Sequence, residues 1–150
     1  MRLTKQTNYA IRMLMYCDSN DGLSRVSDIA KFYDLSEQFL LKILQTLTKS
    51  GLVESVRGRN GGIRLARPAE DIGIGEVVRI TEDSFALAEC FDTGEAACPL
   101  VSTCGLNQAL NEALSAFFRV LDGYTLADLT NNKRNLHVLL QLEAAKQIPL

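Results

Sequence analysis

The chain has 150 residues, 47% of them hydrophobic, and a formal net charge of −2 at pH 7, which fits one ordinary hydrophobic core. There is no run of about 18 apolar residues that would predict a membrane-spanning helix. The first residues mix charged and polar side chains and lack a small-residue cleavage site, so we expect no secretory signal. We therefore expect a cytoplasmic protein, in which clustered cysteines more often bind metal or do redox chemistry than form structural disulfides.

The charge is divided unevenly along the chain. Residues 1–68 contain 11 Lys and Arg against 6 Asp and Glu, whereas residues 69–150 contain 5 against 12. A basic amino-terminal half on an acidic protein indicates a polyanionic partner for that half. Chance clustering of solvated surface charge is the alternative, and charge alone does not decide between the two.

The first predicted element is a helix over residues 3–17. Thr4 is a candidate N-cap, and apolar residues recur at helical spacing from Tyr9 to Cys17. Because Cys17 lies on this apolar stripe, we interpret it as a small buried hydrophobic side chain rather than a ligand. The turn-forming residues 18–24 then predict a loop.

Two helices joined by a tight turn are predicted next. The first begins near Ser27, which we expect to be its cap, and the apolar residues expected to be buried are Ile29, Ala30, Phe32 and Tyr33. The turn is at residues 34–35, and the second helix begins after its cap Ser36 and ends at Gly51. This pattern is typical of a helix-turn-helix, whose second helix enters the major groove of DNA.

The second of these helices has an apolar and a polar face. The apolar face consists of Leu40, Ile43, Leu44 and Leu47. The opposite face consists of Gln38, Leu41, Lys42, Gln45 and Lys49. Its amides suit base edges and its ammonium groups suit phosphates, which predicts a DNA-reading surface. Leu41 either contacts a thymine methyl group or is an ordinary exposed leucine.

A β-hairpin is predicted directly after this helix. Strands over residues 52–56 and 63–66 flank the sequence RGRNGG, which contains an Asn-Gly turn signal. A hairpin at this place is a wing, and its tip offers Arg57, Arg59 and Asn60 to DNA, where arginine suits a narrow minor groove. The alternative is a solvated hairpin with incidental arginines.

The carboxy-terminal half is predicted to be helical around one irregular segment. After a turn over residues 68–73, a short helix over residues 74–83 directs Val77, Val78 and Thr81 inward. A long helix over residues 105–121, ended by Gly123, has an apolar stripe made of Leu106, Leu110, Ala113, Leu114, Phe117, Phe118 and Leu121. We expect this stripe to pair with the same helix of a second copy, and packing against its own domain is the alternative.

The irregular segment carries three cysteines. Cys90, Cys98 and Cys104 are spaced C-x7-C-x5-C among Gly, Asp, Glu and Pro residues. A segment without regular structure is unusual in a compact domain unless something crosslinks it. Thiolates suit an iron–sulfur cluster, which would order the segment when bound. Zinc and a regulatory disulfide are the alternatives, although the tight CxxC pairs of structural zinc sites are missing.

Three stretches together resemble a known family. MRLTKQTNYAIRML, GLVESVRGRNGGIRLARP and the three-cysteine segment resemble the iron–sulfur winged-helix regulators of the IscR, NsrR and RirA type. The likeness is strongest to the iron-responsive RirA members, through VVRITEDSFALAECF and CPLVSTCGLN, and covers nearly the whole chain. It implies a homodimer on double-stranded operator DNA, with the long helix at the dimer interface and a cluster held by three cysteines.

The resemblance also assigns roles to individual residues. Cluster ligation falls on Cys90, Cys98 and Cys104, and DNA contact falls on Ser36, Gln38, Lys42, Arg57 and Arg59. The implied cofactor is a [4Fe–4S] cluster, with [2Fe–2S] as the alternative. Asn107 stands where IscR-like members have a histidine, and Asn8 stands where the nitric-oxide sensors supply an aspartate from the partner. Because neutral amides are poor iron ligands, the fourth position has no assigned ligand, and water or a small thiol could fill it. His137 in the weakly specified tail is a possible ligand, but an ordinary solvent-facing or packed histidine is the favoured interpretation.

These observations predict a mainly α fold with a small β-hairpin wing. Residues 1–68 would form a winged helix-turn-helix, and residues 69–150 would hold a cluster-binding loop (88–107), a dimerisation helix (105–122) and the tail. The expected function is an iron-responsive repressor and not an enzyme, with affinity for DNA lost at low iron or on oxidation. The alternatives are a nitric-oxide or redox sensor of the same family and, less favoured, a zinc-containing DNA-binding protein or an iron–sulfur electron carrier.

Overall fold

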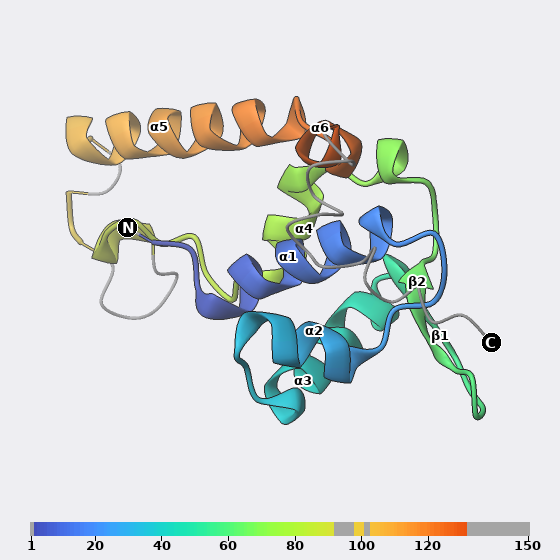
Figure 1. The fold of residues 1–150 in the computed structure, drawn as a ribbon. Coiled ribbons are helices and arrows are strands. Elements are labelled where there is room, and N and C mark those ends of the chain that lie inside the picture. Colours follow the sequence, from blue (N-terminus) through green and yellow to red (C-terminus); the bar gives the residue numbers. More distant parts are fainter. Residues whose placement is uncertain (1, 92–97, 101–102, 132–150) are drawn as a thin grey trace.

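The computed structural model describes residues 2–91, 98–100 and 103–131 (Figure 1). The elements in chain order are α1 Lys5–Ser19, α2 Val26–Tyr33, α3 Glu37–Lys49, β1 Val53–Val56, β2 Gly62–Leu65, η1 Ala69–Asp71, α4 Ile74–Thr81, η2 Glu89–Phe91, α5 Gly105–Asp122 and α6 Leu126–Thr130. The predicted fold class, mainly helical with one β-hairpin, is confirmed. Within the described residues, no helix is both long and apolar enough to cross a membrane.

Helix α1 lies at the centre of the packing. The Thr4 hydroxyl accepts a hydrogen bond from the Thr7 backbone N–H at 3.3 Å, which confirms the predicted N-cap. Ala10, Met13 and Leu14 are fully buried, and Cys17 is 4% exposed, as expected for a core stripe. The helix continues two residues beyond Cys17 because its last turn is buried as well.

The helix-turn-helix is present, but its first cap was predicted wrongly. The residue before α2 is Arg25, whose carbonyl accepts hydrogen bonds from the N–H groups of Asp28 and Ile29, so Ser27 lies inside the helix. The start is fixed by tertiary structure, because Ser24 forms a β-bridge with Ile63 of the hairpin. The turn between α2 and α3 is made by Asp34 in the left-handed conformation, with φ of 53°.

The predicted wing is confirmed as an antiparallel pair in which Val53 lies opposite Leu65 and Val56 opposite Gly62. Its turn differs from the predicted Asn-Gly type. The Gly61 N–H donates to the Gly58 carbonyl at 2.9 Å, so Arg59 and Asn60 occupy the centre of the turn. Gly58 takes the positive φ of 120°, a conformation that glycine adopts without steric cost.

One hydrophobic core joins the two halves of the chain. Ile72, Val77 and Leu126 are fully buried in the same cluster as Met13 and Leu14. Helices α4 and α6 therefore pack on α1 and extend the winged domain past the connection at residue 68. The predicted boundary between residues 1–68 and 69–150 separates regions by their expected function, and it stays a prediction.

The short helices of this half follow their local signals. Val77, Val78 and Thr81 of α4 are buried as predicted, although the helix ends at Thr81 and not at residue 83. Thr125 caps α6 in a full capping box: its hydroxyl accepts from the Asp128 N–H, and the Asp128 carboxylate accepts from the Thr125 N–H. The predicted tail, with His137, lies outside the described residues.

Candidate functional site

Helix α3 presents the predicted polar face to solvent. Leu40, Ile43 and Leu47 are at most 1% exposed, so they fix the rotation of the helix on the core. The predicted DNA-facing residues are all exposed, namely Ser36, Gln38, Leu41, Lys42, Gln45 and Lys49. Leu41 is 44% exposed among these polar side chains, which leaves both of its predicted roles open.

An aromatic cluster that the sequence reasoning did not single out holds α3 in place. The Tyr9 ring of α1 lies edge-on to Phe39 of α3 at 6.0 Å and to Tyr33 of α2 at 6.5 Å. The Arg12 guanidinium lies 5.3 Å from the Tyr9 ring centre and 5.5 Å from that of Tyr33. The orientation of the exposed α3 face therefore depends on rings from all three helices.

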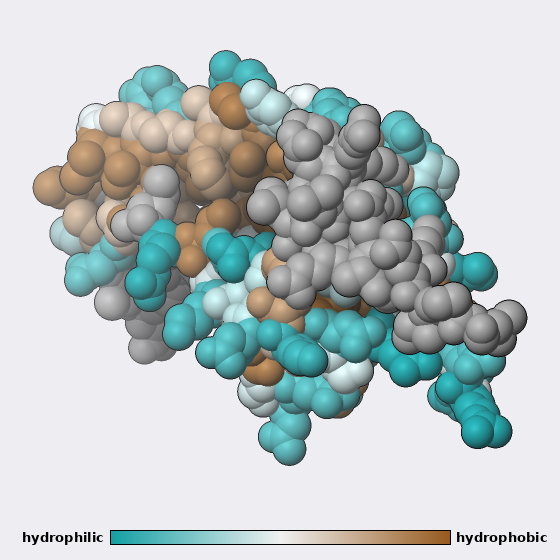
Figure 2. All heavy atoms as spheres, viewed as in Figure 1, coloured by the Kyte–Doolittle hydropathy of each residue, from teal (hydrophilic) through white to brown (hydrophobic). Residues whose placement is uncertain are grey.

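The wing carries its cations at the tip. Arg57, Arg59 and Asn60 are exposed, and Figure 1 shows the hairpin projecting from the body beside α3. Hydrophilic residues dominate the hairpin tip in Figure 2. Arg64, nearer the root, is paired with Glu54 across the two strands, so its charge is balanced within the hairpin.

The root of the wing is fixed to the body. The backbones of Ser24 and Ile63 exchange two hydrogen bonds, at 2.9 and 2.8 Å. Gly61 is needed at the tip because a Cβ there would lie 2.3 Å from the Val56 carbonyl oxygen. With four exposed cations, Lys42, Lys49, Arg57 and Arg59, the α3 face and the wing tip form a surface suited to phosphates and base edges.

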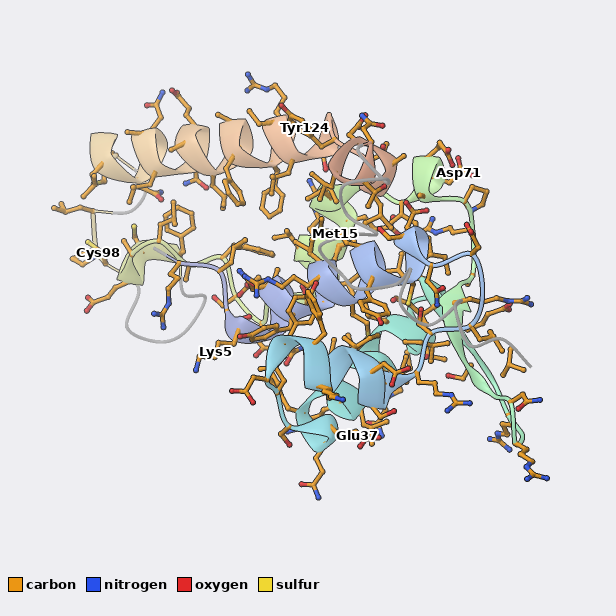
Figure 3. All side chains as sticks on the ribbon, in the orientation of Figure 1. Lys5, Met15, Glu37, Asp71, Cys98 and Tyr124 are labelled. Carbon is orange, nitrogen blue, oxygen red and sulfur yellow. The ribbon has the colours of Figure 1, made fainter. Side chains whose placement is uncertain are left out.

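The three cysteines of the irregular segment differ from the core cysteine. Cys90 lies in η2 and Cys104 is the N-cap residue of α5; these two and Cys98 are half-buried free thiols. Figure 3 shows Cys98 at the end of the molecule where η2 and the first turn of α5 lie. By contrast, burial raises the pKa of the Cys17 thiol from 9.0 to about 12, which keeps that thiol protonated and unsuited to metal.

The thiol donors suit an iron–sulfur cluster in chemistry, since all are unpaired and close in sequence. Over residues 2–91, 98–100 and 103–131, no three His, Cys, Asp or Glu side chains are gathered closely enough to hold a metal ion. The Asn107 carboxamide oxygen accepts a hydrogen bond from the Asn111 side chain at 2.9 Å, and Asn8 is exposed on α1. Neither asparagine is therefore assigned as a fourth ligand within the described residues, and ligation by the three cysteines stays a prediction.

Helix α5 has no buried residue, and its apolar side chains divide into two groups. Five of the predicted stripe are half-buried on the side facing the body: Leu110, Leu114, Phe117, Phe118 and Leu121. A second row is spaced 3-4-3-4 and consists of Leu106, Ala109, Ala113, Ala116 and Val120. Leu106 is 63% and Val120 61% exposed, and apolar residues gather over α5 in Figure 2. We call this second row the α5 seam.

The chain matches the family model Rrf2, described as iron-dependent transcriptional regulator, over residues 3–132. It is 62% identical over 144 residues to Protein aau3 of Rhizobium meliloti (strain 1021), covering 95% of this chain and 94% of that protein. It is 46% identical over 145 residues to the HTH-type transcriptional regulator NsrR of Bacillus subtilis (strain 168), covering 95% and 99%. Among solved structures, T. potens IscR matches with a TM-score of 0.70 and 26% identity, covering 100% of this chain and 94% of that one.

Proposed function

The chain belongs to the Rrf2 family of transcriptional regulators, and from this premise we propose an iron-responsive repressor that binds operator DNA as a homodimer. Its relatives are DNA-binding regulators and not enzymes. In this proposal Cys90, Cys98 and Cys104 hold a [4Fe–4S] cluster, and loss of the cluster at low iron or on oxidation lowers the affinity for DNA. The residues proposed to read DNA are the exposed α3 face and the wing tip.

The observation that carries the iron response is the position of Cys104. This residue is the N-cap of α5, so its backbone carbonyl begins the helix and accepts a hydrogen bond from the Gln108 N–H at 3.2 Å. A bound cluster would supply an iron–thiolate crosslink between the cysteines. Restraining Cys104 relative to Cys90 restrains the amino end of α5 relative to η2, which would couple the thiols to the arrangement of the helix.

The α5 seam supports the homodimer. Ala109, Ala113 and Ala116 form the apolar side of a shallow groove along the helix, whose other lining residues are polar: Gln108, Asn111, Glu112, Ser115 and Arg119. Larger apolar side chains lie at the two ends of the α5 seam, at Leu106 and Val120. The 3-4-3-4 spacing is that of helices that pair along their length. Two copies meeting through this row would bury the apolar side chains that one chain leaves exposed, and would present two recognition helices to a twofold operator.

The test compares two cysteine substitutions in protein purified without oxygen. Cys98→Ser should lower iron and sulfide content and operator affinity together, whereas Cys17→Ala, which removes a cysteine outside the proposed site, should change neither. Native mass spectrometry of the same samples gives cluster nuclearity, zinc content and dimer mass. Unchanged iron content in Cys98→Ser would refute the ligand assignment. Equal operator binding with and without iron would refute the sensing role and leave DNA binding intact.

A nitric-oxide or redox sensor of the same family is the second candidate. The similarity to NsrR at 46% identity over most of both chains favours it. Adding an iron chelator or nitric oxide to separate samples of cluster-loaded protein distinguishes the two. Release from the operator that follows the chelator at low iron supports the iron sensor, and release at one equivalent of nitric oxide per cluster with iron replete supports the second candidate.

A further inference from the structure

The elements of residues 2–81 pack together with α6, and we call this part of the chain the DNA-binding body. Helix α5 is joined to this body at its carboxy-terminal end. The Ile74 N–H donates to the Tyr124 carbonyl at 2.9 Å, and the Leu126 N–H donates to the Ile72 carbonyl at 2.8 Å. These two hydrogen bonds tie the residues after α5 to the start of α4, which is buried in the core. In Figure 1 the other end of α5 extends past the first turn of α1. The angle of this arm is therefore set near α4.

Two side chains connect α4 and α5 at that junction. The Arg79 guanidinium donates to both carboxylate oxygens of Asp122, at 2.6 and 2.8 Å. The same guanidinium lies 4.2 Å from the centre of the Phe118 ring, which in turn lies edge-on to Phe85 at 4.8 Å. The bidentate geometry and the ring contact together favour one distance and one rotation of α5 relative to α4. The Arg79 and Asp122 side chains are both close to half exposed, so the ring contact and the close approach of Gly75 contribute beside the ion pair itself.

Gly75 makes room for this arrangement. A Cβ on Gly75 would lie 2.0 Å from Asp122 Oδ1 and 3.0 Å from Arg79 Nη1, so any larger residue displaces the carboxylate. Glycine is otherwise unfavourable inside a helix, because alanine loses less conformational entropy there. The close approach to Asp122 gives a physical reason for a helix former to be absent at this position.

We propose that Gly75, Arg79 and Asp122 set the angle between α5 and the DNA-binding body, and thereby the half-site spacing that the homodimer reads. This rests on the homodimer of the proposed function and not on the cluster. Eighteen residues of helix span about 27 Å, so a tilt of roughly 5° at the junction moves the far end by about 2 Å. That is more than half of the roughly 3.4 Å between base pairs, enough to misplace one half-site.

The test measures operator binding by wild type, Gly75→Ala and Arg79→Met, with Arg119→Met as the control. Arg119 is an exposed arginine on the same helix and is not one of the side chains that connect α4 and α5. Because it borders the groove beside Ala113 and Ala116, the native mass of this control is measured as well. Each protein is titrated against operators with the natural central spacer and with one base pair added or removed. The measured quantity is the ratio of affinities for natural and altered spacing, together with the thermal midpoint and the native mass.

Wild type and Arg119→Met should bind the natural spacing roughly tenfold or more tightly than the altered spacing. This factor is comparable to the loss of affinity that one mismatched base pair causes. Gly75→Ala and Arg79→Met should lose most of this preference while remaining dimeric. Gly75→Ala should keep its thermal midpoint because alanine favours the helix, which separates positioning from general destabilisation. Dimeric variants that keep the wild-type ratio would overturn the proposal alone. A monomeric wild type would overturn the homodimer and this proposal with it.

Discussion

Substituting Arg59 by Gln should lower the salt dependence of operator binding by a predictable amount. The α3 face and the wing tip expose four cations in each chain, Lys42, Lys49, Arg57 and Arg59. Each phosphate contact contributes about 0.9 to the slope of log affinity against log salt, so eight cations in a homodimer give a slope of about −7. Removing Arg59 from both copies removes two contacts and reduces the slope to about −5.

This difference is large enough to measure by fluorescence anisotropy with a labelled operator. Between roughly 50 and 200 mM salt, the wild type should lose about four decades of affinity and Arg59→Gln about three. At the lowest salt the variant should already bind more weakly, because the lost cation lies at the centre of the wing turn. The two binding curves should therefore converge as salt rises.

The matched control lies in the same hairpin. Arg64 is paired with Glu54, so replacing both by Gln removes one arginine from the wing without changing its net charge. This double variant should keep the wild-type slope. A slope unchanged in Arg59→Gln, or changed equally in the double variant, would show that the wing tip does not contact phosphate.

Three further outcomes follow from single side chains. In cluster-free protein at pH 8, a thiol reagent should label three cysteines rapidly and Cys17 only after unfolding, since burial raises the pKa of Cys17 to about 12. The raised pKa of Cys17 leaves the free energy of unfolding undiminished below pH 9 and lowers it as pH rises from 9 toward 12; Cys17→Ala should flatten this decline in urea titrations. Thr125→Ala should lower the free energy of unfolding by about 1 kcal/mol through loss of the α6 cap, whereas Thr125→Ser should not. Ala113→Glu should give monomers in sedimentation velocity because it places a charge in the α5 seam, and Ser115→Glu, off the seam, should leave the dimer intact.

Local signals were enough to predict the elements whose ends are made by nearby residues. The Thr4 cap and the Gly51 terminator, with φ of 71°, act within a few residues of chain, so they can be read in order. The start of α2 could not be read this way, because the Ser24 bridge to Ile63 joins residues far apart in sequence. Local signals therefore favour Ser27 as the cap of α2, although Ser27 lies inside the helix.

The candidate site shows the same division. Helical periodicity predicted which face of α3 is exposed, since Leu40, Ile43 and Leu47 face the core whatever covers them. Arg12 was not singled out, because its stacking requires rings from two different helices. Hydrophobicity alone also cannot tell which apolar side of α5 its own domain covers.

The two ends of α5 are held in different ways, and this bears on how a change at the three cysteines would be transmitted to the DNA-binding surface. Its carboxy end is held through Asp122 and the hydrogen bonds around Tyr124, while its amino end begins at Cys104. A restraint applied to Cys104 acts at about 27 Å from the junction, so a small force there turns the whole helix. The same restraint placed near Asp122 would have almost no lever arm. In the proposed homodimer, cysteines at this far end are therefore where a change in the proposed ligation would have the greatest mechanical effect on the spacing of the two recognition helices.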